Sequence, residues 1–157
     1  MKPILIIGYG NRLCGDDGVG PAVVKALEAR YAGDVAVSLL ARHQLTPELV
    51  DFIVGKDLVI FIDATLEGAP GEITERKVNQ EAEVATLSHT CTPTNLLVAA
   101  RVLFGSHVSG VVVTVAGESF EVGEGLSAKV RNALPGLVER ILGIVEERRT
   151  GARVLHR

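Results

Sequence analysis

The sequence has few of the residues on which several classes of protein depend. Two cysteines, Cys14 and Cys91, are too few for a disulfide framework, and no Cys-x-x-Cys pair indicates a closed zinc site. Aromatic residues make up 4% of the chain and tryptophan is absent, which argues against a stacking platform for single-stranded nucleic acid. Sixteen Lys and Arg against 19 Asp and Glu give a net charge of −3, which is no footprint for DNA or RNA. We therefore expect no nucleic-acid partner.

Long apolar runs are also absent. The apolar run at residues 4–7 is shorter than the hydrophobic core of a signal peptide. No stretch reaches the roughly 18 uninterrupted apolar residues that a membrane helix needs. These absences favour a soluble cytoplasmic protein that uses no membrane, and a monomer is the default expectation.

The chain does have the length and the apolar content for one folded domain. Its 157 residues are 47% hydrophobic and 22% charged, a composition that excludes a disordered chain. Short β-branched runs alternate with segments of helical period, which is typical of an α/β domain. We predict a single α/β domain over residues 1–149, with a central twisted, mostly parallel five-stranded sheet flanked by helices on both faces. Residues 150–157 are predicted to be a frayed tail.

Local signals place the elements of this domain. Strands are predicted at residues 4–7, 35–40, 58–62, 72–78 and 110–116, with 72–78 at an edge. Helices are predicted at residues 17–31, 47–54 and 93–104, and a last one follows Ser127 as far as residue 149. Pro135-Gly136 is expected to break or kink that last helix.

Polar residues follow three of the predicted strands. The first strand leads to the acidic pair Asp16-Asp17, the third ends at Asp63, and the last is followed by Glu118. The crossover after the third strand carries His89 just before a helix. Ligands of an open parallel sheet bind outside the carboxyl ends of its strands, so two carboxylates and an imidazole can meet there.

Asp17, Asp63 and His89 are the donor types of an open metal site with mixed oxygen and nitrogen ligands. Each residue also has an ordinary structural explanation. Asp17 would suit a helix N-terminus, Asp63 could accept hydrogen bonds from turn amides, and His89 could be a plain loop histidine. Spacing alone does not decide between these interpretations.

The glycine-rich first loop has two interpretations as well. Gly8 and Gly10 ahead of a helix could hold a phosphate on backbone amides, as in a dinucleotide site. However, Leu13 stands where the third glycine of that motif belongs, and the Asp16-Asp17 pair would repel an anion. The loop therefore favours a cation, although a tight turn would by itself explain the glycines.

The residues of this loop also carry a resemblance to a known family. The segment Gly8-Tyr9-Gly10-Asn11-Arg12-Leu13-Cys14-Gly15-Asp16-Asp17-Gly18-Val19-Gly20-Pro21 closely resembles the opening of the hydrogenase maturation endopeptidases. The similarity continues in order through Ile62-Asp63-Ala64, Ser88-His89, Thr92-Pro93, Val113-Thr114-Val115-Ala116-Gly117-Glu118-Ser119 and Gly125-Leu126-Ser127. It therefore spans nearly the whole chain.

The resemblance implies a specific activity and site. Family members remove a C-terminal extension from the large-subunit precursor of nickel–iron hydrogenases after nickel has been loaded. The implied metal site comprises Asp17, Asp63 and His89, which would bind nickel presented by the substrate; zinc or cadmium could occupy it in vitro. Either the metal takes part in hydrolysis, or it only positions the peptide while Asp17 or Asp63 takes a proton from water.

The sequence departs from the family pattern at three places. Arg42-His43-Gln44-Leu45-Thr46-Pro47 replaces a glycine-rich turn found in some members, which makes His43 a candidate substitute or extra ligand. The segment Thr90-Cys91-Thr92-Pro93 varies in length among relatives, which affects the alignment of His89. The first-loop ligand is Glu in some members and Asp17 here, so the shorter side chain could alter the distance to the metal.

Two other functions remain open on the sequence. One is a flavodoxin-like module that binds a nucleotide or phosphate at Gly8 and Gly10. The other is a nickel-sensing assembly chaperone without peptidase activity. The metal-dependent endopeptidase is the preferred hypothesis.

Overall fold

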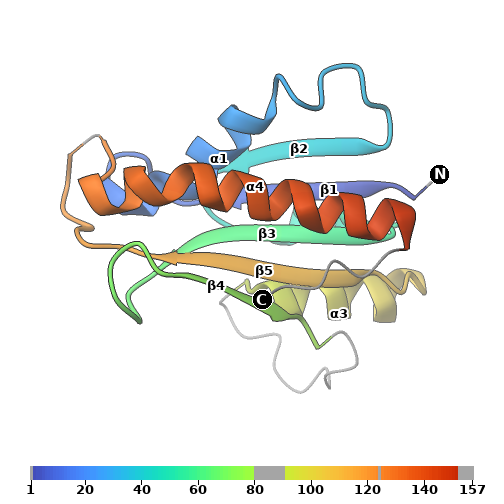
Figure 1. Cartoon of the computed structure of the whole chain (residues 1–157). Helices are drawn as coiled ribbons and strands as arrows, with labels where there is room; N and C mark the ends of the chain where they lie inside the picture. Colours follow the sequence, from blue (N-terminus) through green and yellow to red (C-terminus); the bar gives the residue numbers. More distant parts are fainter. Residues whose placement is uncertain (1, 80–90, 124, 152–157) are drawn as a thin grey trace.

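The sheet is mostly parallel, as predicted. The computed structural model describes residues 2–79, 91–123 and 125–151. Five strands lie in the order β2-β1-β3-β5-β4 (Figure 1). Their bounds are β1 (Ile4–Tyr9), β2 (Val37–Arg42), β3 (Leu58–Thr65), β4 (Ile73–Lys77) and β5 (Ser109–Ala116). The edge strand β4 pairs antiparallel with β5, and every other pairing in the sheet is parallel.

Helices cover both faces of this sheet. They are α1 (Val19–Leu27), α2 (Val50–Ile53), α3 (Pro93–Phe104) and α4 (Ala128–Thr150), with 3-10 turns η1 (Gly15–Gly18) and η2 (Pro47–Leu49). Ile4, Ile6, Ile60 and Ile62 point toward α1 and α4, which Figure 1 shows crossing one face. The alternate residues Leu5, Ile7, Val59 and Phe61 point toward α2 and α3. This alternation is what a strand buried on both faces produces.

Capping residues explain where two helices begin. Thr92 Oγ1 accepts a hydrogen bond from the Asn95 N–H at 3.1 Å, and Pro93 occupies the first turn of α3. Ser127 Oγ accepts one from the Val130 N–H at 3.4 Å at the start of α4. Both helix starts were predicted.

Two sequence predictions about helices were wrong in part. The first helix was expected to reach residue 31 but ends at Leu27, and its predicted start at residue 17 is a 3-10 turn. The last helix runs unbroken through Pro135. Pro135 is exposed, so water can bond the backbone groups that its ring frees, while Leu137 and Ile141 stay packed on the sheet.

Two glycines let α1 begin directly over the sheet. A Cβ on Gly8 would lie 2.1 Å from the Gly20 carbonyl oxygen, and one on Gly20 would lie 2.6 Å from the Ile62 carbonyl oxygen. Neither position therefore tolerates a side chain. Close packing of α1 on β1 and β3 accounts for these glycines without a bound phosphate.

The described helices are too short or too polar to cross a membrane, and the last one ends close to the C-terminus. None of the helices in the described part of the chain combines the length and apolar character that crossing a membrane requires. The helix α4 ends at Thr150, capped by Gly151 with φ +71°. The predicted tail lies largely outside the described residues, because residues 152–157 are not among them.

Candidate active site

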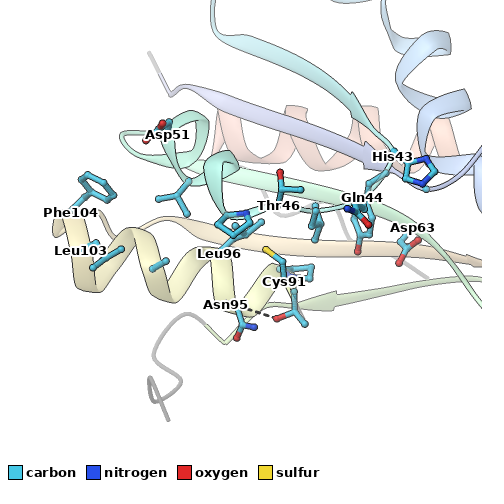
Figure 2. Close-up of a pocket in the computed structure, with 18 of the residues that line it drawn as sticks. His43, Gln44, Thr46, Asp51, Asp63, Cys91, Asn95, Leu96, Leu103 and Phe104 are labelled. Carbon is cyan, nitrogen blue, oxygen red and sulfur yellow. Dashed lines mark hydrogen bonds between the residues drawn. The ribbon is translucent and has the colours of Figure 1, made fainter. Parts of the chain in front are cut away.

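A cleft of about 1290 Å³ opens at the carboxyl end of the central strands. Its wall includes Asp17 and Asp63 at one end, residues 43–47 along one side, and the helix α3 along the other. Figure 2 shows His43, Gln44 and Asp63 grouped at one end of this cleft, with Leu103 and Phe104 at the other. The structure therefore has a cleft at the edge of the sheet where the sequence predicts a ligand site.

Asp63 lies in the strand β3, two residues before its end, and is half-buried. Its Oδ1 accepts a hydrogen bond from the Ala64 N–H at 2.8 Å, and its carboxylate also bonds the Tyr9 side chain. Burial raises the pKa of Asp63 to about 6, and the negative charge of Asp17 acts in the same direction. A carboxyl group with a pKa this near neutral is a candidate functional group.

Asp17 reaches the same cleft from the 3-10 turn η1. Its Oδ2 accepts a hydrogen bond of 2.6 Å from the Asn11 N–H, which fixes the carboxylate against the first loop. Gly10, with φ +145°, makes this loop geometry possible, because a Cβ there would lie 1.9 Å from the Asp17 carbonyl oxygen. The structure thus brings together two of the predicted site residues, Asp17 and Asp63.

The third predicted residue, His89, lies outside the described residues. Among those that are described, no group of three or more His, Cys, Asp or Glu side chains is placed to hold a metal ion. His43 lines the cleft with Asp17 and Asp63 and is exposed, but it completes no such group. The donors found in the described ranges are therefore a pair of carboxylates.

Tyr9 is a functional candidate that the sequence analysis did not single out. It is the last residue of β1, and its hydroxyl hydrogen-bonds Asp63. Burial, followed by the charge of Asp63, raises the pKa of Tyr9, so the phenol stays protonated and donates. Strand alternation could have identified it, because Tyr9 shares the face of Ile7 and Asp63 shares the face of Phe61.

Arg76, on the edge strand β4, supplies a positive charge to the cleft. This charge lowers the pKa of Tyr9, against the larger effects that raise it. No ion pair in the described part of the chain includes Arg76.

Cys91 lies in the same cleft but is unsuited to attack a peptide bond. Burial raises the pKa of its thiol, and the charge of Glu48 raises it further. A thiol with a raised pKa carries little thiolate at neutral pH. The structure therefore favours the carboxylates over Cys91 as the reactive groups.

Asp16, the neighbour of Asp17 in the acidic pair, does not line the cleft. It is fully buried and accepts four hydrogen bonds, from Glu118 N–H, Ser119 N–H, Ser127 N–H and Ser127 Oγ, at 2.7–3.1 Å. Burial would raise the pKa of Asp16, but these donors, with Ser127 N–H first, outweigh it and hold the pKa below its usual value. Glu118, another sequence candidate, is exposed and lies off the cleft wall.

Relatives of known sequence are hydrogenase maturation proteases. No family model matches the chain. A predicted hydrogenase maturation protease of Methanocaldococcus jannaschii is 31% identical over 154 residues, covering 93% of this chain and 98% of that protein. The hydrogenase 2 maturation protease of Escherichia coli is 29% identical over 152 residues, covering 92% of this chain and 91% of that protein.

Solved structures lead to the same family. The hydrogenase maturating endopeptidase of Escherichia coli superposes with a TM-score of 0.79 at 26% identity, and the match covers 93% of each chain. Its fold is the same α/β arrangement. The similarity in sequence and in structure extends over nearly the full length of the chain, and the chain belongs to the hydrogenase maturation proteases.

Proposed function

We propose that this endopeptidase removes the C-terminal extension of a nickel-loaded [NiFe]-hydrogenase large-subunit precursor, with Asp17, Asp63 and His89 binding the nickel. The observation that carries the proposal is the pair of carboxylates at one end of a long cleft, one of them with a pKa raised to about 6. Family membership supplies the class of reaction. Protease activity within this family favours the peptidase over the nucleotide-binding module and the chaperone.

The carboxylate pair suits a divalent cation. Backbone hydrogen bonds orient Asp17 through Oδ2 and Asp63 through Oδ1, and each group keeps lone pairs for a ligand. Burial makes ionised Asp63 unfavourable and the negative charge of Asp17 adds to this effect, so a cation between the two carboxylates would favour their ionised forms. Carboxylates and one imidazole accept nickel, and zinc or cadmium would fit the same donors in vitro.

The residues of the site then have distinct tasks in hydrolysis. The carboxylates of Asp17 and Asp63 would hold a divalent ion, which would supply Lewis-acid polarisation of the scissile carbonyl. If the metal only positions the peptide, Asp63 is suited to accept a proton from the attacking water, because burial raises its pKa to about 6. The Tyr9 hydroxyl holds Asp63 in place, and Arg76 can bind a carbonyl or carboxylate of the substrate.

The test is cleavage of a purified large-subunit precursor, nickel-loaded and nickel-free in parallel, by the wild-type protein and by Asp63→Asn. We expect a mobility shift only for the nickel-loaded precursor with wild-type protein. Binding of the loaded precursor without any cleavage would replace the peptidase by a chaperone. Absence of binding would show that the partner is a different protein.

Three broader expectations accompany the proposal. The protein should act in the cytoplasm, and it should elute from a sizing column as a monomer. Residues 1–149 should suffice for processing, and residues 150–157 should be dispensable. A truncated protein that folds but does not process the precursor would contradict the last expectation.

A further inference from the structure

The cleft has two chemically different ends. One end holds the carboxylates Asp17 and Asp63, and Arg76 lines the same cleft. The other end lies against the last turn of α3, where Leu103 and Phe104 line the wall. Figure 2 shows Asp63 at one end of the cleft, Leu103 and Phe104 at the other, and Leu96 between them. The polar and apolar ends belong to one continuous hollow.

Leu103 and Phe104 are unusually exposed for such large apolar side chains. The exposed fraction is 70% for Leu103 and 56% for Phe104. Phe52, which is also exposed, differs because the guanidinium of Arg42 lies over its ring at 5.7 Å. An apolar wall left open inside a concave site is typical of a binding surface.

The helix α3 forms a long wall of the cleft, which ends at Leu103 and Phe104. Thr92, at the start of the helix, also lines the cleft, and α3 has 12 residues, so the wall runs for about 18 Å. An extended peptide advances about 3.3 Å per residue, so about five or six residues span this distance. An extended terminal segment of this length can therefore lie along the wall.

We propose that the end of the cleft formed by Leu103 and Phe104 binds an apolar side chain of the C-terminal extension, about five or six residues from the scissile bond. This inference rests on the proposed function, because it places the extension in the same cleft. The α3 end thereby sets a sequence preference within the extension. The two carboxylates at the opposite end determine where the chain is cut.

The experiment compares Leu103→Ser with a matched control on the same helix. Val102 is 48% exposed and does not line the cleft, so Val102→Ser changes an adjacent apolar surface without touching the wall. Leu103→Met tests rescue by a side chain of similar size. Both kcat and KM are measured on the nickel-loaded precursor, and circular dichroism confirms folding of every variant.

We expect Leu103→Ser to raise KM about tenfold with kcat unchanged, as expected for losing part of a buried leucine contact. Val102→Ser and Leu103→Met should behave as wild type. A precursor with serine at the fifth and sixth positions after the scissile bond should show the same rise in KM with wild-type protein. With that precursor, Leu103→Ser should have no further effect.

Each alternative outcome has a distinct meaning. Equal KM for Leu103→Ser and Val102→Ser, or a full effect of Leu103→Ser on the serine-substituted precursor, would overturn the inference alone. Dimerisation that Leu103→Ser abolishes would assign the surface to a second copy of the chain and also overturn it. Failure of the wild-type protein to cleave any precursor would overturn the proposed function and this inference together.

Discussion

Asp16 and Asp63 lie in neighbouring regions at the same edge of the sheet, yet their surroundings act on the two carboxylates in opposite directions. Asp16 is buried among four hydrogen-bond donors from the segment between β5 and α4, which hold its pKa below the usual value. Asp63 has fewer donors, and burial raises its pKa to about 6. The number of donors, rather than burial, distinguishes the structural carboxylate from the one facing the cleft.

The two regions therefore depend on pH with opposite sign. The lowered pKa of Asp16 contributes stability at pH values above its unfolded pKa, and this stability is lost as pH falls through the folded pKa. Asp63 favours the folded state in its protonated form, and this contribution is lost as pH rises from about 3.8 to about 6. At neutral pH the ionised Asp16 therefore stabilises the folded state, whereas Asp63 in the cleft lowers its stability. Functional sites often reduce stability in this way.

The largest effect is expected when the cleft loses a candidate ligand. Asp17→Asn, Asp63→Asn and His89→Ala should each lower precursor cleavage by roughly two to four orders of magnitude, because each removes a ligand or a proton acceptor. Cleavage is measured by the mobility shift of the precursor, and circular dichroism should show an unchanged fold. Wild-type rates in all three variants would eliminate this site.

Asp16→Asn should instead act on stability. The substitution leaves buried N–H donors facing an amide, so we expect the free energy of unfolding to fall by about 3 kcal/mol. Urea denaturation at pH 7.5 measures this change. An unchanged unfolding midpoint would mean that the hydrogen bonds to Asp16 contribute little to stability. Asp16 would then not be a structural carboxylate in contrast to Asp63.

Asp63→Asn should change stability in the opposite direction. Removing a carboxyl group that is costly to ionise should raise the free energy of unfolding at pH 7.5 by about 1–3 kcal/mol. The variant should also lack the decline in stability that Asp63 causes in the wild type between about pH 4 and pH 6. Parallel pH profiles of unfolding for the wild type and Asp63→Asn would show that the pKa of Asp63 is not raised.

Tyr9→Phe should have the smallest effect. The hydrogen bond from Tyr9 lowers the pKa of Asp63 against the larger effect of burial, so its loss should raise that pKa further. We expect the acidic limb of the cleavage–pH profile to move to higher pH, with a several-fold loss of rate near pH 6. Tyr31→Phe, away from the cleft, is the matched control. Identical profiles for the two variants would remove Tyr9 from the site.

Much of the fold could be predicted because local sequence signals agree with the tertiary packing. Thr92-Pro93 and Ser127 fixed the starts of α3 and α4, and the apolar run at residues 58–62 marked the central strand. Pro135 misled the prediction because propensity does not report which side of a helix faces water. Strand alternation places Tyr9 and Asp63 on the same face of the sheet, but only the pairing of β1 with β3 makes them neighbours.

The sequence by itself determined that Asp17 and Asp63 would meet at one edge, because parallel strands deliver their carboxyl ends to the same side of a sheet. Only the tertiary structure shows the physical reason that Asp17, and not Asp16, faces the cleft. Both lie in the 3-10 turn η1, where successive side chains point about 120° apart, so only one of them can face the hollow. The loop between β5 and α4 supplies the donors that hold Asp16 on the other side, and this loop is more than a hundred residues away in the sequence.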